Sequence, residues 1–198
     1  MKYNKGVLRV WGILWLCGVV TGLWILLTYE NTPGASGTPT LQWPISSQIH
    51  RTPGHATLVM LAHPHCPCTR ASIGELAVLM AHVSEPLTAY VLFLTPPGFP
   101  AGWEKTDLWD SAVAIPGVHV LSDKGGIEAR RFRAATSGHT ILYDAAGRLL
   151  FTGGITGSRG HFGDNAGRSA ILSFLHHRAA ERTQTFIFGC SLFDPNNQ

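Results

Sequence analysis

The most informative stretch of the chain is residues 57–80, which read TLVMLAHPHCPCTRASIGELAVLM. The apolar run 57–62 predicts a short buried strand, and residues 71–80 predict a helix. Cys66 and Cys68 therefore lie where a strand passes into the N-terminus of a helix. Unpaired backbone N–H groups and the helix dipole favour a thiolate at such a place. A thiolate is the form of cysteine that attacks disulfides and binds soft metals.

An apolar segment near the N-terminus has the composition of a membrane anchor. Residues 10–28 form an uncharged run of about 19 residues, the length needed to cross a bilayer. Lys2, Lys5 and Arg9 precede this run, so the positive-inside rule places residues 1–9 in the cytoplasm. We predict a single-pass protein of the bacterial inner membrane with its domain in the periplasm. A cleaved signal peptide is the alternative, but no small-x-small cleavage pattern closes the run.

The charge of the predicted exported part excludes one class of function. The chain carries a formal charge of +3, from 15 Lys and Arg and 12 Asp and Glu. Three basic residues lie within residues 1–9 and all acids lie at Glu30 or later, so the exported part has 12 of each sign and is neutral. Because no basic stripe marks it, we expect no nucleic-acid partner.

The cysteines indicate chemistry rather than a disulfide framework. Cys17 lies inside the predicted anchor, where it serves as a small apolar residue. Cys66, Cys68 and Cys190 remain in a compartment that permits disulfides. An odd number of thiols there favours redox chemistry or metal binding.

Strands and helices alternate along the rest of the chain. Residues 29–53 are rich in Pro, Gly, Ser and Thr and predict a linker, residues 54–182 a single domain, and residues 183–198 a C-terminal tail. Within the domain we expect further strands at 88–94 and 117–121, helices at 103–112, 126–134 and 165–182, and a hairpin of 140–143 and 149–152. This order predicts an α/β domain whose mixed central sheet is flanked by helices.

The order strand, paired cysteines, helix, strand, hairpin and closing helix resembles the thioredoxin fold. The segment from Val118 to the hairpin is similar to the insertion of exported, membrane-tethered thioredoxin-like proteins. The Cys-Pro-Cys site resembles that of bacterial membrane-anchored RedB-type proteins. The chain departs from thioredoxin in two places: one residue, Pro67, separates the cysteines instead of two, and His139 stands where the family has a cis-proline facing the active site.

The leading hypothesis is a thiol–disulfide oxidoreductase that uses Cys66 and Cys68. One thiol would attack a substrate disulfide and the other would resolve the mixed disulfide, and the family position favours Cys66 for the attack. A disulfide across one residue closes a small, strained ring, which favours an oxidant or isomerase over a stable reductant. This function needs no cofactor, and its partner is a protein thiol or disulfide. The plain alternative is a pair of buried free thiols or a structural bridge.

The competing hypothesis is a copper-binding chaperone or sensor. Two thiolates and the imidazole of His139 would suit Cu(I), and the partner would be a copper-accepting protein. Residues 138–143 also resemble the histidine-bearing segment of the Sco copper-delivery proteins, whose cysteines are more widely spaced. In the redox hypothesis His139 instead assists as an acid or base. A peroxidase is a weaker third class, because the Thr that peroxiredoxins place before their attacking cysteine is absent.

Four further residues are candidate accessory groups: His65, Arg70, His161 and Cys190. His65 would lower a cysteine pKa or join a metal site, and Arg70 would stabilise a thiolate. His161 belongs to the Gly-rich loop 153–165, which we expect to border the site. Cys190 lies in an apolar tail that would bring it back as a resolving thiol or a third sulfur ligand. The plain alternatives are solvent-facing charges for the first three and a small buried residue for Cys190.

Overall fold

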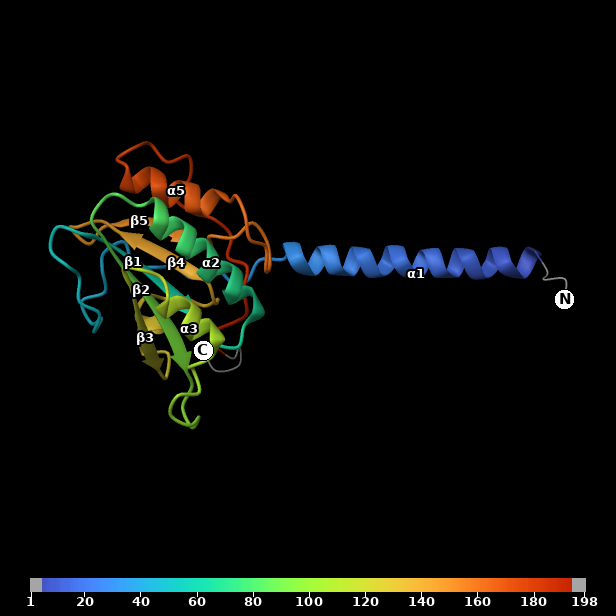
Figure 1. Ribbon diagram of the computed structural model, residues 1–198, viewed down its shortest axis with the longest axis horizontal. Coiled ribbons are helices and arrows are strands. Elements are labelled where there is room, and N and C mark those ends of the chain that lie inside the picture. The colour runs from blue at the N-terminus through green and yellow to red at the C-terminus, as the bar shows by residue number, and fades with distance from the viewer. Residues whose placement is uncertain (1–4, 194–198) are drawn as a thin grey trace.

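The computed structural model of the protein describes residues 5–193 (Figure 1). Its first element, α1 (Lys5–Asn31), projects away from the domain and has no buried residue. This helix is longer at both ends than the predicted span 10–28. Within the described residues it is the one helix long and apolar enough to cross a membrane, a property that a signal sequence shares. The predictions for residues 1–4 and 194–198 lie outside the described part of the chain.

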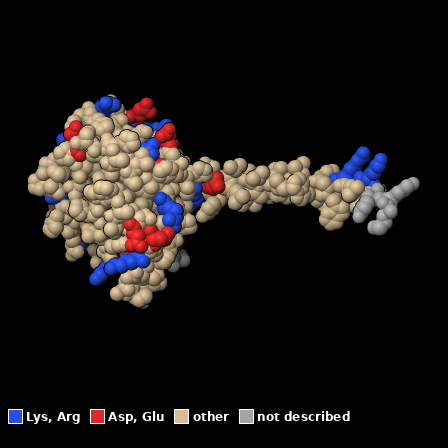
Figure 2. Space-filling model, viewed as in Figure 1, with Lys and Arg blue, Asp and Glu red and all other residues tan. Residues whose placement is uncertain are grey.

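Charge is distributed differently over α1 and over the domain. The middle of α1 is bare of charged residues, and Lys and Arg appear only toward its N-terminal end (Figure 2). On the face of the domain seen in that view, residues of both signs are scattered without a basic stripe. This pattern is what a membrane helix joined to a neutral domain requires.

Five strands form one mixed sheet in the order β3-β2-β1-β4-β5. Its parallel part consists of β1 (Ala56–Ala62), β2 (Leu87–Thr95) and β3 (Val118–Lys124). On the other side of β1, the hairpin of β4 (His139–Tyr143) and β5 (Leu149–Gly153) runs antiparallel. The predicted mixed sheet and hairpin are therefore confirmed. The strand β3 continues beyond residue 121, where we expected it to end, because it stays paired with β2 as far as Lys124.

Four helices cover the sheet: α2 (Pro67–His82), α3 (Asp107–Val113), α4 (Ile127–Arg131) and α5 (Ala166–Leu175). Side chains alternate along each strand, so successive core residues face opposite sides of the sheet. Leu58 and Met60 face the side covered by α2, α3 and α5, whereas Val59 and Leu61 face the side covered by α4. This arrangement is a thioredoxin-like α/β fold preceded by a long apolar helix.

Three helices are shorter than the sequence pattern predicts, and one of them is the helix expected at 126–134, which spans only Ile127–Arg131. The helix expected at 103–112 begins only at Asp107, because the Thr106 side chain accepts a hydrogen bond from Leu108 N and caps it there. The helix expected at 165–182 begins after Asn165, whose side chain caps it by accepting a hydrogen bond from Arg168 N. It ends at Leu175, since His177 adopts a left-handed conformation with φ 54°.

The segments on either side of the domain lie against it. Within residues 32–53, which we expect to form a linker, Gly34 N donates to Ile187 O at 2.8 Å. The Trp43 ring packs edge-on against Phe132 with centroids 5.0 Å apart. The end of α1 is thereby held beside residues 183–193, which we call the C-terminal segment. The end of α1 and the C-terminal segment both lie close to the paired cysteines.

Candidate functional site

The paired cysteines lie at the junction of β1 and α2, as the sequence predicts. Cys66 is the N-cap of α2, and Pro67 follows at a position where a missing N–H costs nothing. Both sulfurs belong to free thiols, and both residues are buried. The Cys66 N–H donates to His63 O at 3.2 Å, which closes the turn between strand and helix. The first turn of α2 therefore presents two thiols at a helix N-terminus.

A third cysteine reaches this site from the far end of the chain. The backbone N–H of Cys190 donates to Cys66 Sγ at 3.3 Å. Cys190 is held in place because its carbonyl accepts from Ser137 N at 2.8 Å and the next residue but one, Leu192, donates to Ala135 O at 2.9 Å. The C-terminal segment thus runs along the loop before β4 and brings its cysteine to Cys66.

Through Ser137, the loop before β4 contacts the turn that carries the paired cysteines. The Ser137 hydroxyl accepts from His63 N at 2.8 Å and shares a hydrogen bond of 2.7 Å with Thr69 Oγ1 on the first turn of α2. Sequence reasoning missed this residue, because a serine in a Gly-containing loop carries no signal of its own. The contact depends on β1 and β4 being neighbours in the sheet.

The three thiols differ in how readily they ionise. Burial opposes ionisation of Cys66, but hydrogen bonds from Cys190 and Thr69 outweigh it and lower the pKa of Cys66. Burial and the nearby charge of Cys66 raise the pKa of Cys68. Burial, followed by the hydrogen bond to Cys66 and the charge of Cys66, raises the pKa of Cys190 to about 12. Cys66 is therefore the thiol of the three that ionises most readily.

A substitution of Thr69 tests this account of the Cys66 thiolate. We expect Thr69→Val to raise the pKa of Cys66 by about one to two units, because a hydrogen bond to a charged group contributes about 1.5–3 kcal/mol. The measurement is the ultraviolet absorbance of the thiolate against pH, attributed to Cys66 by its loss in Cys66→Ala. Thr69→Ser keeps the hydroxyl and should leave the pKa in place. An unchanged pKa in Thr69→Val would mean that Cys190 and the helix N-terminus suffice.

Arg159 supplies the positive charge of the site. Burial keeps the pKa of Cys68 high, and the charge and hydrogen bond of Arg159 partly counteract this effect. The Arg159 guanidinium donates to Gly189 O at 2.7 Å through Nη1 and to Thr32 O at 3.1 Å through Nε. Its Cζ lies 5.0 Å from the centre of the Tyr29 ring. One side chain thus connects the Gly-rich loop 153–165, the C-terminal segment and the end of α1 to the thiols.

His139 points away from the cysteines. It lies on β4 on the same face as Ile141, which packs on the side of the sheet opposite α2. Its Nε2 is 2.7 Å from Thr152 Oγ1 on β5, and its buried Nδ1 has no hydrogen-bond partner within the described residues. Among the residues that the structure describes, no three His, Cys, Asp or Glu side chains are arranged to hold a metal ion. Cys66, Cys68 and His139 therefore do not fit a copper ion in this structure.

Burial of His139 makes stability depend on pH. Desolvation lowers the pKa of His139 to about 4, below the ordinary value of 6.5, so only the unfolded chain takes up a proton between these values. The contribution to stability is complete above pH 6.5 and is lost as the pH falls toward 4. We expect a loss of about 2 kcal/mol between pH 7 and pH 5.

Denaturant unfolding at the two pH values measures this loss. His139→Leu should remove most of it, while substitution of the exposed His50 by Leu should leave it. If His139→Leu kept the full pH dependence, other buried groups would be responsible for it.

The other predicted accessory residues lie at the edge of the site. His65 is exposed, and its ring packs against Trp103 at a tilt of 55°, with centroids 4.5 Å apart. Arg70 forms an exposed ion pair with Asp107 at the start of α3. The exposed His161 has its Nδ1 3.3 Å from the carbonyl oxygen of Arg159. These three residues thus contact neighbours other than the thiols, whereas Cys190 contacts Cys66.

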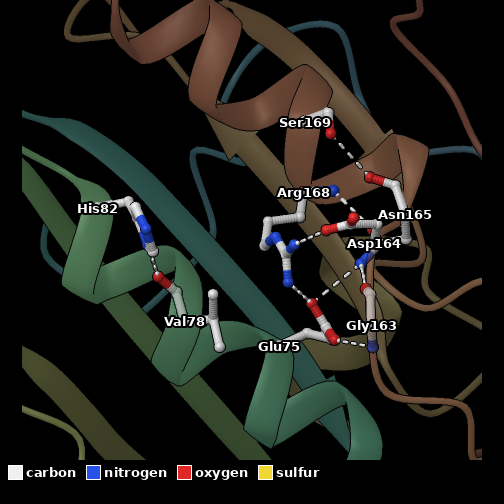
Figure 3. A network of polar contacts seen from close by, with 8 residues as sticks. All are labelled: Glu75, Val78, His82, Gly163, Asp164, Asn165, Arg168 and Ser169. Carbon is white, nitrogen blue, oxygen red and sulfur yellow. Dashed lines mark hydrogen bonds and ion pairs between the residues drawn. The ribbon is translucent and has the colours of Figure 1, made fainter.

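A buried ion pair joins α2 to α5, and hydrogen bonds to the carboxylate of this pair hold the end of the Gly-rich loop (Figure 3). Glu75 on α2 is fully buried and pairs with Arg168 on α5. Its carboxylate also accepts from Gly163 N at 2.6 Å and from Asn165 Nδ2 at 3.0 Å. The loop that carries Arg159 is therefore fixed at its far end to the helix that carries the cysteines.

Cys66 borders an open hollow on the side of α3. The hollow has a volume of about 300 Å³. Its wall consists of Pro64, His65, Cys66, Pro67, Arg70 and the first residues of α3, with Thr106 before them. Cys66 itself is 1% exposed at this hollow.

Comparison with solved structures identifies the fold. The structure is similar to an uncharacterised conserved protein from Geobacillus kaustophilus, with a TM-score of 0.59, 18% identity, and coverage of 83% of this chain and 93% of that one. It is equally similar to a hypothetical protein from Sinorhizobium meliloti, with a TM-score of 0.60, 19% identity, and coverage of 81% and 93%.

A more distant match is a secreted disulfide oxidoreductase of Mycobacterium tuberculosis homologous to Escherichia coli DsbE. Its TM-score is 0.40 at 16% identity, covering 49% of this chain and 67% of that one. No protein-family profile matches the chain, and no curated protein matches its sequence. The chain thus shares its fold with the Geobacillus and Sinorhizobium proteins.

Proposed function

We propose that the protein is a membrane-anchored thiol–disulfide oxidoreductase whose reacting pair is Cys66 and Cys68. The observation that carries this proposal is the contrast between the two thiols. Cys66, at the N-cap of α2, has a lowered pKa, whereas Cys68, one residue further on, has a raised pKa. A nucleophile that ionises more readily than its neighbouring partner is the arrangement that favours disulfide exchange.

The exchange proceeds in two balanced steps. The Cys66 thiolate attacks one sulfur of a substrate disulfide, forming a mixed disulfide and releasing the other substrate sulfur as a thiolate. Cys68 then gives up its proton and attacks Cys66 Sγ, which forms the Cys66–Cys68 disulfide and releases the second substrate sulfur. In the reverse direction a substrate dithiol is oxidised. Hydrogen bonds to the Cys66 thiolate stabilise the reduced protein, and this favours substrate oxidation or isomerisation.

The proposed setting is the periplasmic face of a bacterial inner membrane, as in the RedB-type proteins that the Cys-Pro-Cys site resembles. The apolar helix α1 supports a membrane anchor. The redox function proposed for the three thiols that follow it in the chain needs a compartment in which disulfides persist. The substrate is a protein thiol or disulfide that enters by the hollow beside Cys66.

Redox equilibration of the full chain in detergent tests the proposal. In a Cys17→Ser background, the chain is incubated in glutathione buffers of graded potential, and free thiols are counted after acid quenching. We expect a reversible two-electron transition that Cys66→Ser abolishes. A chain that stays reduced over the whole range would contradict the proposal. If that chain also bound Cu(I) tightly, and lost it in Cys66→Ser or His139→Ala, the copper alternative would replace the redox function.

A further inference from the structure

Cys190 is placed as a reactant toward Cys66. Its N–H donates to Cys66 Sγ at 3.3 Å, and its thiol also hydrogen-bonds to Cys66. Cys68 is the other thiol in contact with Cys66. The sulfur of Cys66 is thus flanked by two thiols, one from its own helix and one from a segment 124 residues further along the chain.

The C-terminal segment is held in this position independently of the cysteines. Ser191 forms an antiparallel bridge with Thr136, next to the hydrogen bond from Ser137 N to Cys190 O. Gly189 lies so close to the same loop that a Cβ there would be 2.0 Å from Ser137 O. Since the backbone around Cys190 is already ordered, bond formation to Cys66 needs little further loss of chain entropy.

A disulfide between Cys66 and Cys68 is restricted by local geometry instead. Only Pro67 separates the two residues, and its ring fixes φ. Cys68 also belongs to the first turn of α2, so closing the small ring must change the geometry of the helix start. Cys190 approaches from outside the helix and is free of this restriction.

We propose that Cys190 is a third redox-active cysteine. It displaces Cys68 from the Cys66–Cys68 disulfide and forms a Cys66–Cys190 disulfide, which links the C-terminal segment covalently to the site. This inference rests on the proposed function, because that exchange supplies the initial Cys66–Cys68 disulfide. It gives the oxidised protein a second form, in which Cys68 is again a free thiol.

The step is an internal exchange that needs no added oxidant. Cys190 Sγ bonds to Cys66 Sγ while the Cys66–Cys68 bond breaks, and Cys68 leaves with the electron pair. The proton of Cys190 passes to Cys68, so one disulfide and one thiol are present before and after. Arg159 stabilises the departing Cys68 thiolate, because its charge and hydrogen bond act on that sulfur.

Peptide mapping of the full chain distinguishes the two disulfides. Trypsin places both Cys66 and Cys68 in peptide 52–70 and Cys190 in peptide 183–198. The Cys17→Ser chain is oxidised with glutathione disulfide in detergent, alkylated and digested without reduction. We expect peptides 52–70 and 183–198 to be recovered as one cross-linked species. Recovery of only an internal disulfide in peptide 52–70 would overturn the inference while leaving the proposed function intact.

A kinetic comparison tests the same step without Cys68. In the Cys68→Ser chain, a glutathione adduct on Cys66 should decay at least about tenfold faster than in Cys68→Ser/Cys190→Ser, because a thiol in contact acts as an intramolecular reagent. Equal decay in both chains would overturn the role of Cys190. If neither an adduct nor any disulfide formed in any chain, the proposed function itself would fail.

Discussion

Replacing Cys66 by Ser is expected to slow disulfide exchange by on the order of 10³-fold or more. Of the thiols at the site, Cys66 alone has a lowered pKa, and it is the one that borders the open hollow. The serine hydroxyl stays protonated and is a far weaker nucleophile, while its volume is nearly the same. The measurement is the release of the coloured thiolate from an aromatic disulfide by the full chain in detergent.

Two variants show whether this loss belongs to the attack itself. Cys68→Ser should keep the first release, because the attack by Cys66 does not use the neighbouring thiol. Cys17→Ser should behave as the parent chain, since Cys17 is exposed on α1. If Cys66→Ser kept the first release and Cys68→Ser lost it, the two thiols would have the opposite roles.

The second large effect is expected in stability, at the ion pair of Glu75 and Arg168. Arg168→Met leaves the fully buried Glu75 carboxylate without its charge partner. Its remaining contacts are the amides of Gly163 and Asn165. Breaking a buried pair from one side costs about 3–5 kcal/mol, and we expect the free energy of unfolding to fall by that amount. Denaturant unfolding of the full chain measures it.

The double variant Glu75→Leu/Arg168→Met is the matched control. It removes both charges together, so most of the lost stability should return. Arg70→Met breaks an exposed pair with Asp107 and should change stability little. A small loss in Arg168→Met would mean that the amide contacts alone support the buried carboxylate. A large loss of stability should also make the loop that carries Arg159 less ordered. The interaction of Arg159 with the Cys68 thiol would then weaken.

Much of the site was predictable because its parts are neighbours in the chain. The apolar run 57–62 predicts the strand before Cys66, and the pattern of residues 71–80 predicts α2, although the helix begins earlier, at Pro67. The asparagine cap of α5 and the hairpin also follow from local residue types. Local geometry couples these positions within a few residues, so composition and spacing are sufficient to predict them.

The orientation of His139 could not be predicted from local residue types. Its order in the chain places it in the loop before the hairpin, but it is the first residue of β4. Since side chains alternate along a strand, a shift of one residue changes the face on which a side chain lies. The His139 side chain consequently lies on the same face of the sheet as Ile141, on the side away from α2. Ser137, two residues earlier, is the one that meets the turn at His63 and Thr69.

The sequence by itself determined the α/β fold, the apolar helix and the pair of thiols at the start of α2, because each depends on residues close together in the chain. Only the tertiary structure decided which groups surround those thiols. Arg159 and Cys190 reach them because the Gly-rich loop and the C-terminal segment meet at the end of β1. Packing of distant segments sets such contacts, and no spacing within one segment encodes them. The electrostatic difference between Cys66 and Cys68, on which the proposed function depends, is therefore a property of the folded chain.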